Sequence, residues 1–540
     1  MMSGAKRAAI SKEGESSHIM RPKKAQETNV PGQNRHQGIV DIGSNSVRLM
    51  IAEIREDMTF QIVDQWKEVV RLGDEYDEDG AIPEYKIDKL ISTLLLFKQL
   101  CSRYEPCEII AVATAALRKA TNRALILSRI LGATQLSVRV ISGESEAYLD
   151  YLAVVSTMNI QNGLLIDIGG GSLEMVLIQQ RELKESISIP IGALTLASQY
   201  EVRGALEAKE EQRLIADMEK LLSQIDWLQQ AEGYTLIGVG GTIRTIAKMD
   251  KALAKVPLAS LHHYVLEWEQ VKQWHESLKP LLLEEREKIQ GLSKDRADIF
   301  MGAFTFIKHV MERLDMPALM VSAKGIREGV LFDVLQGNGL TIDAPLSLSI
   351  SNMMRRFHLQ VEHARRVHVL FTRLVEDMGA LMELEGDWSQ IMCASAMLHD
   401  CGIVISPLER ERHALYMLLH SDLYGLTPRE LVLSAFLASA DQKLKAGEAW
   451  SDYEALFHPG DKEGVRTLSI LLRLAISFNR GAATDVALDA CDIEEQEVVF
   501  HVRASTPPLL EVSEAYAVRT AFRKRFKRDL VIVAHVTQSR

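Results

Sequence analysis

The chain has 540 residues, of which 47% are hydrophobic and 25% charged, and a formal net charge of −11. This length is too great for a single hydrophobic core and predicts about three or four domains. The apolar runs are short and interrupted by charged residues, which excludes a membrane-spanning helix. The five cysteines form no C-x-x-C pair and no apolar signal segment is present, so we expect reduced thiols and a cytoplasmic protein.

Residues 1–37 are polar, lack hydrophobic periodicity and include several Lys and Arg. They are predicted to form a disordered basic arm. Residues 38–150 alternate strand-like and helix-like segments, which predicts a first α/β lobe. Its expected elements include a helix over 87–104 and strands over 108–113 and 137–141.

This lobe opens with the motif Asp41-Ile42-Gly43-Ser44-Asn45-Ser46 between two apolar runs. The pattern predicts a β-hairpin with a carboxylate at the end of its first strand and exposed N–H groups in its turn. Such a turn can bind phosphate oxygens. Asp41 would repel a bare anion, so it implies a divalent cation beside the phosphate. The residues expected to bind phosphate here are Gly43, Ser44, Asn45 and Ser46.

Residues 151–340 repeat this motif and predict a second α/β lobe, which ends in helices over 297–314 and 326–335. Two facing hairpins would form a phosphoryl-transfer cleft. A third glycine-rich loop leads from a strand into a helix, whose N-terminus is a further expected anion site. The phosphate-binding residues expected in this lobe are Gly169, Gly170, Gly171, Ser172, Gly240, Gly241 and Thr242.

The two hairpins differ in charge at one corresponding position. Glu174 follows the second turn, whereas Arg48 holds the equivalent place after the first. This asymmetry suits a cleft in which only one side coordinates a metal ion or water.

Beyond residues 337–339 the apolar residues recur at helical spacing, which predicts a helical domain over 341–485. Residues 486–540, with expected strands over 497–502 and 530–536, predict a small α/β domain. An acidic protein that handles a polyanion needs local basic patches. One candidate is a helix near the end of the chain, with Phe522 and Phe526 packed inward. Its basic residues are Arg519, Arg523, Lys524, Arg525, Lys527 and Arg528.

Five motifs follow one another along the chain. They are the first aspartate turn, residues 142–147 (Ser-Gly-Glu-Ser-Glu-Ala), the second aspartate turn, Gly240-Gly241-Thr242 and Arg327-Glu328-Gly329. Over residues 38–479 the chain resembles the exopolyphosphatase / guanosine pentaphosphate phosphatase family of the actin–hexokinase–Hsp70 superfamily. The resemblance implies two actin-like (ribonuclease H-like) lobes with an interlobe cleft, an all-α HD-like domain and a small α/β C-terminal domain. It also implies removal of a terminal phosphoryl group by water with Mg²⁺.

By this resemblance Glu146 is the general base and Arg118 is the arginine beside the phosphate. Asp167 and Glu174 match acids of the second phosphate loop, and with Asp41 they are the expected Mg²⁺ ligands. Phosphoryl transfer depends on positioning and charge neutralisation, which this set can supply. The alternative interpretation is that Glu146 is an ordinary carboxylate at the start of a helix and that Arg118 pairs with a nearby acid.

Two positions depart from the family pattern. Ser145 stands where a second Glu usually precedes the base, and Ala323, followed by Lys324, stands where an Asp is common. Both departures bear on the preferred substrate and on the metal dependence.

The helical block resembles an HD domain through His363 and the adjacent His399-Asp400 pair. Ile476 occupies the place of the fourth metal ligand, although Asp441 could substitute for it. Since three ligands bind a metal more weakly than four, we expect a vestigial site. By the resemblance, the domain would help to hold the polyanion and to form a homodimer.

An exopolyphosphatase is favoured slightly over a guanosine pentaphosphate phosphohydrolase. A superfamily kinase would need adenosine and acceptor sites, for which the sequence has no signature. A non-enzymatic sensor of an alarmone or of polyphosphate would use the same loops for binding alone. An enzyme with its chemistry at His399 and Asp400 would instead use the helical block. No membrane and no specific nucleic acid is expected as a partner.

Overall fold

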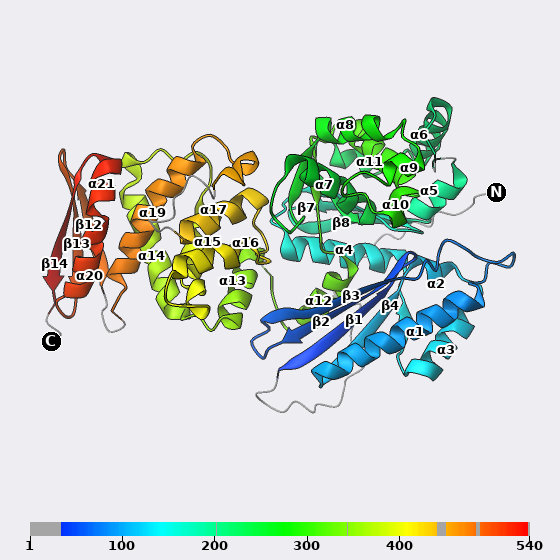
Figure 1. Ribbon diagram of the computed structural model, residues 1–540, viewed down its shortest axis with the longest axis horizontal. Helices are drawn as coiled ribbons and strands as arrows, with labels where there is room; N and C mark the ends of the chain where they lie inside the picture. The colour runs from blue at the N-terminus through cyan, green and yellow to red at the C-terminus, as the bar shows by residue number, and fades with distance from the viewer. Residues whose placement is uncertain are drawn as a thin grey trace.

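The computed structural model describes residues 34–537 except 201, 203, 343, 440–449 and 482–485. Two mixed sheets form two lobes, followed by a helical domain and a three-stranded sheet at the far end of the molecule (Figure 1). The predicted arm is too long, because β1 begins at Arg35 and pairs with β2 from that residue. Residues 1–33 of that arm lie outside the described residues. Within the described chain, no helix is long and apolar enough to cross a membrane.

The sheet of lobe I has the strand order β3-β2-β1-β4-β5. The hairpin β1–β2 is antiparallel, and β1 also pairs in parallel with β4. Successive side chains of β1 face opposite sides of the sheet, so Val40 packs toward α1 and α3 while Ile39 packs toward α4 and α12. The elements are β1 (Arg35–Ile42), β2 (Ser46–Ile54), β3 (Phe60–Val69), α1 (Glu84–Cys101), β4 (Cys107–Ala113), α2 (Ala115–Lys119), α3 (Arg123–Thr134), β5 (Val138–Val140) and α4 (Gly143–Thr157).

Lobe II repeats this plan in a sheet with the order β10-β11-β9-β6-β7-β8. Its hairpin β6–β7 is antiparallel, and β6 pairs in parallel with β9, as β1 does with β4. The elements are β6 (Gly163–Ile168), β7 (Leu173–Gln179), β8 (Glu182–Ile189), α5 (Ala193–Gln199), α6 (Ala208–Leu222), β9 (Leu236–Gly240), α7 (Gly241–Ala254), β10 (Tyr264–Glu267), α8 (Trp268–Leu278), α9 (Leu283–Arg286), α10 (Lys294–Ala297), α11 (Phe300–Arg313), β11 (Ala318–Val321) and α12 (Ile326–Gly337). The two-lobed fold predicted from the repeated motif is confirmed.

Helix α4 lies between the lobes and packs on both (Figure 1). Its Leu149 belongs to the core of lobe I, and its Val154 to a cluster under the sheet of lobe II. Helix α12 does not cover lobe II as its place in the sequence suggested. It returns to lobe I, where Val330 and Phe332 pack against the β1–β2 sheet.

The contact between α4 and α12 depends on Gly329. A Cβ atom at this position would overlap the carbonyl oxygen of Leu149 on α4. The absence of a side chain therefore lets the two helix backbones approach closely, and this contact holds α4 in place between the lobes.

The helical domain and the C-terminal α/β unit share one hydrophobic core, in which Phe371 and Phe478 are continuous with Phe500 and Phe522. The expected strands over 497–502 and 530–536 are confirmed as β13 and β14. The elements are α13 (Pro345–Arg356), α14 (Val361–Asp377), α15 (Ser389–Leu398), α16 (Arg410–Leu419), α17 (Pro428–Ala438), α19 (Asp461–Phe478), β12 (Ala487–Ile493), β13 (Glu497–Ala504), α20 (Leu509–Ala515), α21 (Arg519–Phe526) and β14 (Asp529–Val536).

We expect Gly329→Ala to lower the free energy of unfolding by about 1–3 kcal/mol, because the added methyl group forces α4 and α12 apart. Denaturant unfolding measures the change. Gly132→Ala in α3 is the matched control, because nothing lies within 4 Å of its Cβ position. The control should raise stability by roughly 0.5–1 kcal/mol through helix propensity. Equal effects of the two substitutions would contradict this account.

Candidate active site

The two aspartate turns have the same internal geometry and meet across the space between the lobes. The Gly43 N–H donates to Ser46 O at 3.1 Å, and the Gly169 N–H donates to Ser172 O at 3.0 Å. A Cβ atom at Gly170 would lie 3.0 Å from the Cβ of Ser44. The phosphate-binding residues predicted in the two hairpins are thus brought together at one place.

Lys119 joins the two lobes beside these turns. It lies on α2 of lobe I, and its Nζ donates to Gly171 O at 2.7 Å and to Pro190 O at 3.3 Å in lobe II. Behind the second turn, the N–H groups of Ala193 and Leu194 donate to Gly169 O and Gly170 O at 2.9 and 3.0 Å. The start of α5 therefore holds the shape of this turn.

The third glycine-rich loop completes the cluster. Gly240 has φ = +97°, which favours glycine, and a Cβ atom there would overlap Oδ1 of Asp167. Gly240 therefore allows β9 to pass beside the aspartate of the second turn before α7 begins at Gly241.

A cavity of about 100 Å³ lies where the three loops meet. Its lining combines the loop residues with an unusual number of charged side chains. The carboxylates are Asp41, Glu146, Asp150, Asp167 and Glu328, and the arginines are Arg48, Arg244, Arg296 and Arg327.

Glu146 lies in the first turn of α4 and borders this cavity. Ser142 caps the helix by accepting from the Ser145 N–H at 3.2 Å, so the first departure from the family pattern forms part of the cap. Arg118 Nη1 donates to Glu146 Oε2 at 3.0 Å and to Ile141 O at 3.0 Å. Burial raises the pKa of Glu146 to about 7, although Arg118 opposes this shift. A carboxyl group that ionises near neutral pH is suited to take a proton from water.

Several carboxylate oxygens at the cavity are buried without a hydrogen-bond donor: Asp41 Oδ1, Asp167 Oδ1, both oxygens of Asp150 and Glu174 Oε2. Burial raises the pKa of each of these groups. Unpaired carboxylates in a buried cluster are costly unless a cation or shared protons neutralise them. The donor set is all oxygen, which fits a hard divalent cation such as Mg²⁺.

Asp150 was missed in the sequence. It lies one helical turn after Glu146, is completely buried, and repulsion from Asp167 adds to the effect of burial on its pKa. The interval of four residues was a usable signal, because it places both carboxylates on one face of α4. Glu174, a predicted metal ligand, pairs across the hairpin with Asp167 and accepts from Ser188 Oγ at 2.8 Å. It lies behind the cavity wall and does not line it.

The arginine cluster was also largely missed. Arg48 pairs across the hairpin with Asp41, so the predicted asymmetry between Arg48 and Glu174 is present in the register. Burial, and then repulsion from Arg48 and Arg296, lower the pKa of Arg244 to about 9. Because these guanidinium groups repel one another, binding of an anion between them is strongly favoured. No spacing rule connects Arg296 with the other three, because α10 reaches the cavity only through the tertiary fold.

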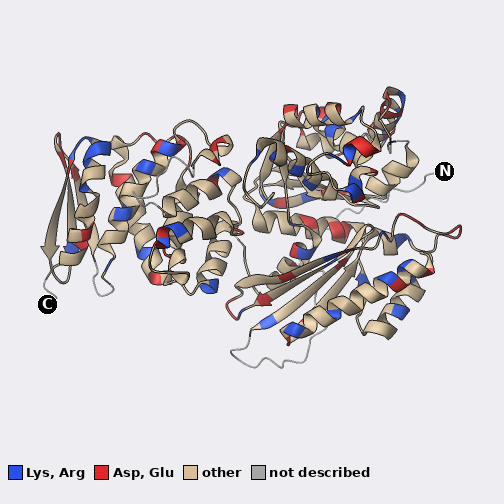
Figure 2. Cartoon of the chain, in the orientation of Figure 1, with Lys and Arg blue, Asp and Glu red and all other residues tan. Residues whose placement is uncertain are grey.

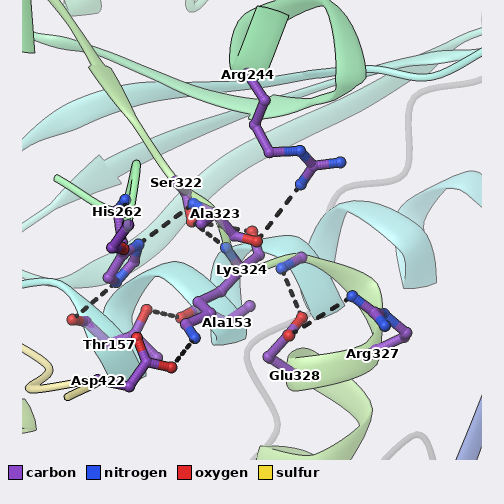
Figure 3. A network of polar contacts seen from close by, with 12 residues as sticks. Ala153, Thr157, Arg244, His262, Ser322, Ala323, Lys324, Arg327, Glu328 and Asp422 are labelled. Atoms are coloured by element: carbon purple, nitrogen blue, oxygen red, sulfur yellow. Dashed lines mark hydrogen bonds and ion pairs between the residues drawn. The ribbon is translucent and has the colours of Figure 1, made fainter. Parts of the chain in front are cut away.

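The loop 322–325 links the cavity to the helical domain (Figure 3). Its Ala323 O accepts from Arg244 Nη1 at 3.4 Å, and its Gly325 N–H donates to Glu328 Oε2 at 3.1 Å. Lys324 forms an ion pair with Asp422 of the helical domain, and its Nζ lies 5.3 Å from the ring centroid of Tyr424. The second departure from the family pattern thus leaves Ala323 in the cleft wall, beside a lysine that anchors the loop to the helical domain.

His363, His399 and Asp400 come together in the helical domain, as the HD resemblance implied, and could hold a metal ion. Burial acts to raise the pKa of Asp400, but the two histidines and Arg410 lower it to about 2. Arg410 donates to Asp400 Oδ1 at 3.2 Å and so competes with a cation. Ile476 is partly buried against the helical core, and Asp441 lies outside the described residues. None of the three ligand candidates lines the interlobe cavity.

The C-terminal basic patch lies on α21 and the turn after it, at the opposite end of the molecule from the cavity (Figure 2). Phe522 and Phe526 are buried, as predicted. Arg525 donates to Thr467 Oγ1 at 2.6 Å, and Arg528 to Glu494 O at 2.7 Å, so part of the patch serves packing. The structure therefore does not bring this patch to the cleft.

The profile of the Ppx/GppA phosphatase family matches residues 50–338, and that of Ppx/GppA phosphatase domain III matches residues 347–513. The chain belongs to the Ppx/GppA phosphatase family. It is accordingly a hydrolase, with two actin-like lobes followed by domain III.

Two solved structures are similar to it. The Aquifex aeolicus member is 30% identical with a TM-score of 0.52, covering 57% of this chain and 100% of its own. An exopolyphosphatase from Cytophaga hutchinsonii is 27% identical with a TM-score of 0.53 and the same coverage.

The Lys324–Asp422 pair should couple the cleft wall to domain III. In a double-mutant cycle of Lys324→Met and Asp422→Asn, we expect a coupling energy of about 1 kcal/mol, because the Lys324 side chain is 9% exposed although that of Asp422 is 50% exposed. The pair Arg412–Glu409, in which both side chains are exposed, is the control and should give about 0.5 kcal/mol or less. Denaturant unfolding measures both cycles. A value for Lys324–Asp422 no larger than the control would contradict the anchoring role.

Proposed function

We propose that this protein is an exopolyphosphatase that removes terminal orthophosphate from inorganic polyphosphate by attack of water, with Glu146 as the general base. The observation that carries the proposal is the buried Glu146 carboxyl group, with a pKa of about 7, at the wall of a cavity enclosed by three phosphate-binding loops. The likeness to an exopolyphosphatase of Cytophaga hutchinsonii supports the same choice. Guanosine pentaphosphate is the alternative substrate.

In the proposed reaction, the N–H groups of the two turns and of the Gly240–Thr242 loop bind the oxygens of the terminal phosphoryl group. Arg48, Arg244, Arg296 and Arg327 neutralise the charge of the phosphates. Glu146 takes the proton from the attacking water, and Arg118 holds the carboxylate in position through its 3.0 Å hydrogen bond. Direct transfer of the phosphoryl group to water needs no covalent intermediate on the protein, so positioning and charge neutralisation are sufficient.

We propose Mg²⁺ as the cofactor, bound by Asp167 and Asp150 and, through water, by Asp41, with Glu174 supporting Asp167 from behind. The unpaired oxygens of these residues support this choice. A bound Mg²⁺ would neutralise charge on the phosphoryl oxygens. The resemblance alone supports a homodimer, and the five free thiols support a cytoplasmic location.

Phosphate release from long-chain polyphosphate and from guanosine pentaphosphate, each with and without Mg²⁺, tests the function. We expect Mg²⁺-dependent release, faster from polyphosphate. Glu146→Gln should lower kcat at least about a hundredfold while substrate affinity is kept, because only the proton acceptor is lost.

Asp400→Asn is the control for chemistry in domain III, and it should leave kcat unchanged. Loss of activity in this variant with retention in Glu146→Gln would place the reaction at the HD-like cluster. Absence of release from both substrates would defeat the proposed activity.

The Mg²⁺ assignment makes a separate prediction. Asp150→Asn should raise the Mg²⁺ concentration for half-maximal activity by about tenfold or more, because a ligand oxygen is lost. Glu174→Gln should shift it less, because Glu174 does not line the cavity. Mg²⁺ titrations of activity and of Tm give two independent readouts. Equal shifts in the two variants would refute the ligand role of Asp150.

A further inference from the structure

Lobe II carries a second hollow outside the cleft, a groove of about 600 Å³. Its walls are the C-terminal half of α7 and the turn at Gln290 and Gly291. A Cβ atom at Gly291, whose φ is +98°, would lie 2.6 Å from the backbone nitrogen of Met249. The turn therefore packs directly on the backbone of α7, and this packing fixes the shape of the groove.

Three lysines line the groove: Lys248 and Lys251 of α7, and Lys255, which caps the end of this helix. They follow Arg244 at intervals of four, seven and eleven residues, which places all four side chains on one face of the helix. Arg244 lines the cleft. A single row of cations thus runs along α7 from the cleft to the groove, over about 16 Å at a rise of 1.5 Å per residue.

The charge of these lysines is not balanced locally. Among the described residues, no carboxylate forms an ion pair with any of the three. Lys251 donates instead to the carbonyl oxygens of Leu258 and Ala259, and burial, followed by repulsion from Lys248, lowers its pKa. Lys248 and Lys255 are exposed. Uncompensated cations in a concave surface favour an anionic ligand.

We propose that this row, Arg244–Lys248–Lys251–Lys255, is the binding track for the outer part of a linear inorganic polyphosphate whose terminal phosphate lies in the cleft. The inference rests on the proposed function and deepens it. Polyphosphate carries negative charge on every unit of an extended chain, which matches cations repeated along one helix face.

The same geometry distinguishes long ligands from short ones. Charges farther apart than about 8 Å are largely screened at physiological ionic strength. Lys255, about 16 Å along α7 from Arg244, can therefore act only on a ligand that reaches it. Guanosine pentaphosphate carries a 5′-triphosphate and a 3′-diphosphate on one ribose, so it cannot offer the lysines a continuous row of phosphates.

The test compares Lys248→Gln/Lys255→Gln with Lys524→Gln/Lys527→Gln in the C-terminal basic patch. The two pairs remove equal charge, and in each the second lysine caps a helix with a left-handed φ, +54° at Lys255 and +57° at Lys527. The readouts are KM and kcat for long-chain polyphosphate and for tripolyphosphate, at low and high salt. Affinity for long-chain polyphosphate is also measured directly in the Glu146→Gln background.

We expect the groove variant to raise KM for long-chain polyphosphate about three- to tenfold, with a smaller rise in the KM for tripolyphosphate, which can reach only Lys248, and without change in kcat. The C-terminal variant should change neither, and high salt should abolish the difference. An unchanged KM, an equal rise for tripolyphosphate, or a rise only in the C-terminal variant would overturn the track.

The outcome separates this inference from the proposed function. If the wild-type protein hydrolyses no polyphosphate, the proposed function fails. The proposed track is then tested separately, by the affinity of the Glu146→Gln protein for long-chain polyphosphate with and without the groove substitutions. Weaker binding only in the groove variant then supports the track as a polyphosphate site, whereas equal or undetectable binding overturns it.

Discussion

The site depends on the burial of opposite charges in one small space. Five carboxylates and four arginines line a cavity of about 100 Å³, and several of the carboxylate oxygens have no donor. Neither set would be stable alone: burial raises the pKa of Asp41, for example, and lowers that of Arg48. Packing of the two lobes around α4 forces these groups together, so the free energy of the fold maintains a cluster that attracts both a phosphate and a cation.

The repeated hairpin is the part of this arrangement that the sequence could reveal. The order Asp, Gly, Ser between two apolar runs is a local pattern, and it correctly predicted both sheets and the meeting of their turns. Arg296 and the return of α12 to lobe I could not be predicted in the same way, because both depend on contacts between segments far apart in the chain. Asp150 could have been predicted in part, because it follows Glu146 by four residues and therefore lies on the same face of a helix.

The duplicated hairpins have diverged at one cross-strand pair. In lobe I, Asp41 faces Arg48, whereas in lobe II Asp167 faces Glu174. The first pair is internally balanced, and the second adds to the negative charge of the cleft. The same backbone hairpin thus carries a charge-balanced pair in one lobe and two carboxylates in the other.

The return of α12 has a consequence for biosynthesis. Residues 326–337 supply Val330, Phe332 and Leu335 to the core of lobe I, so a ribosome must translate all of lobe II before the first lobe can close its hydrophobic interior. Many multidomain chains fold each unit as it emerges. In this protein one face of the nascent first sheet is covered only by α4 until the second lobe is complete, which makes the two lobes a single folding unit and gives chaperones a defined interval in which to act.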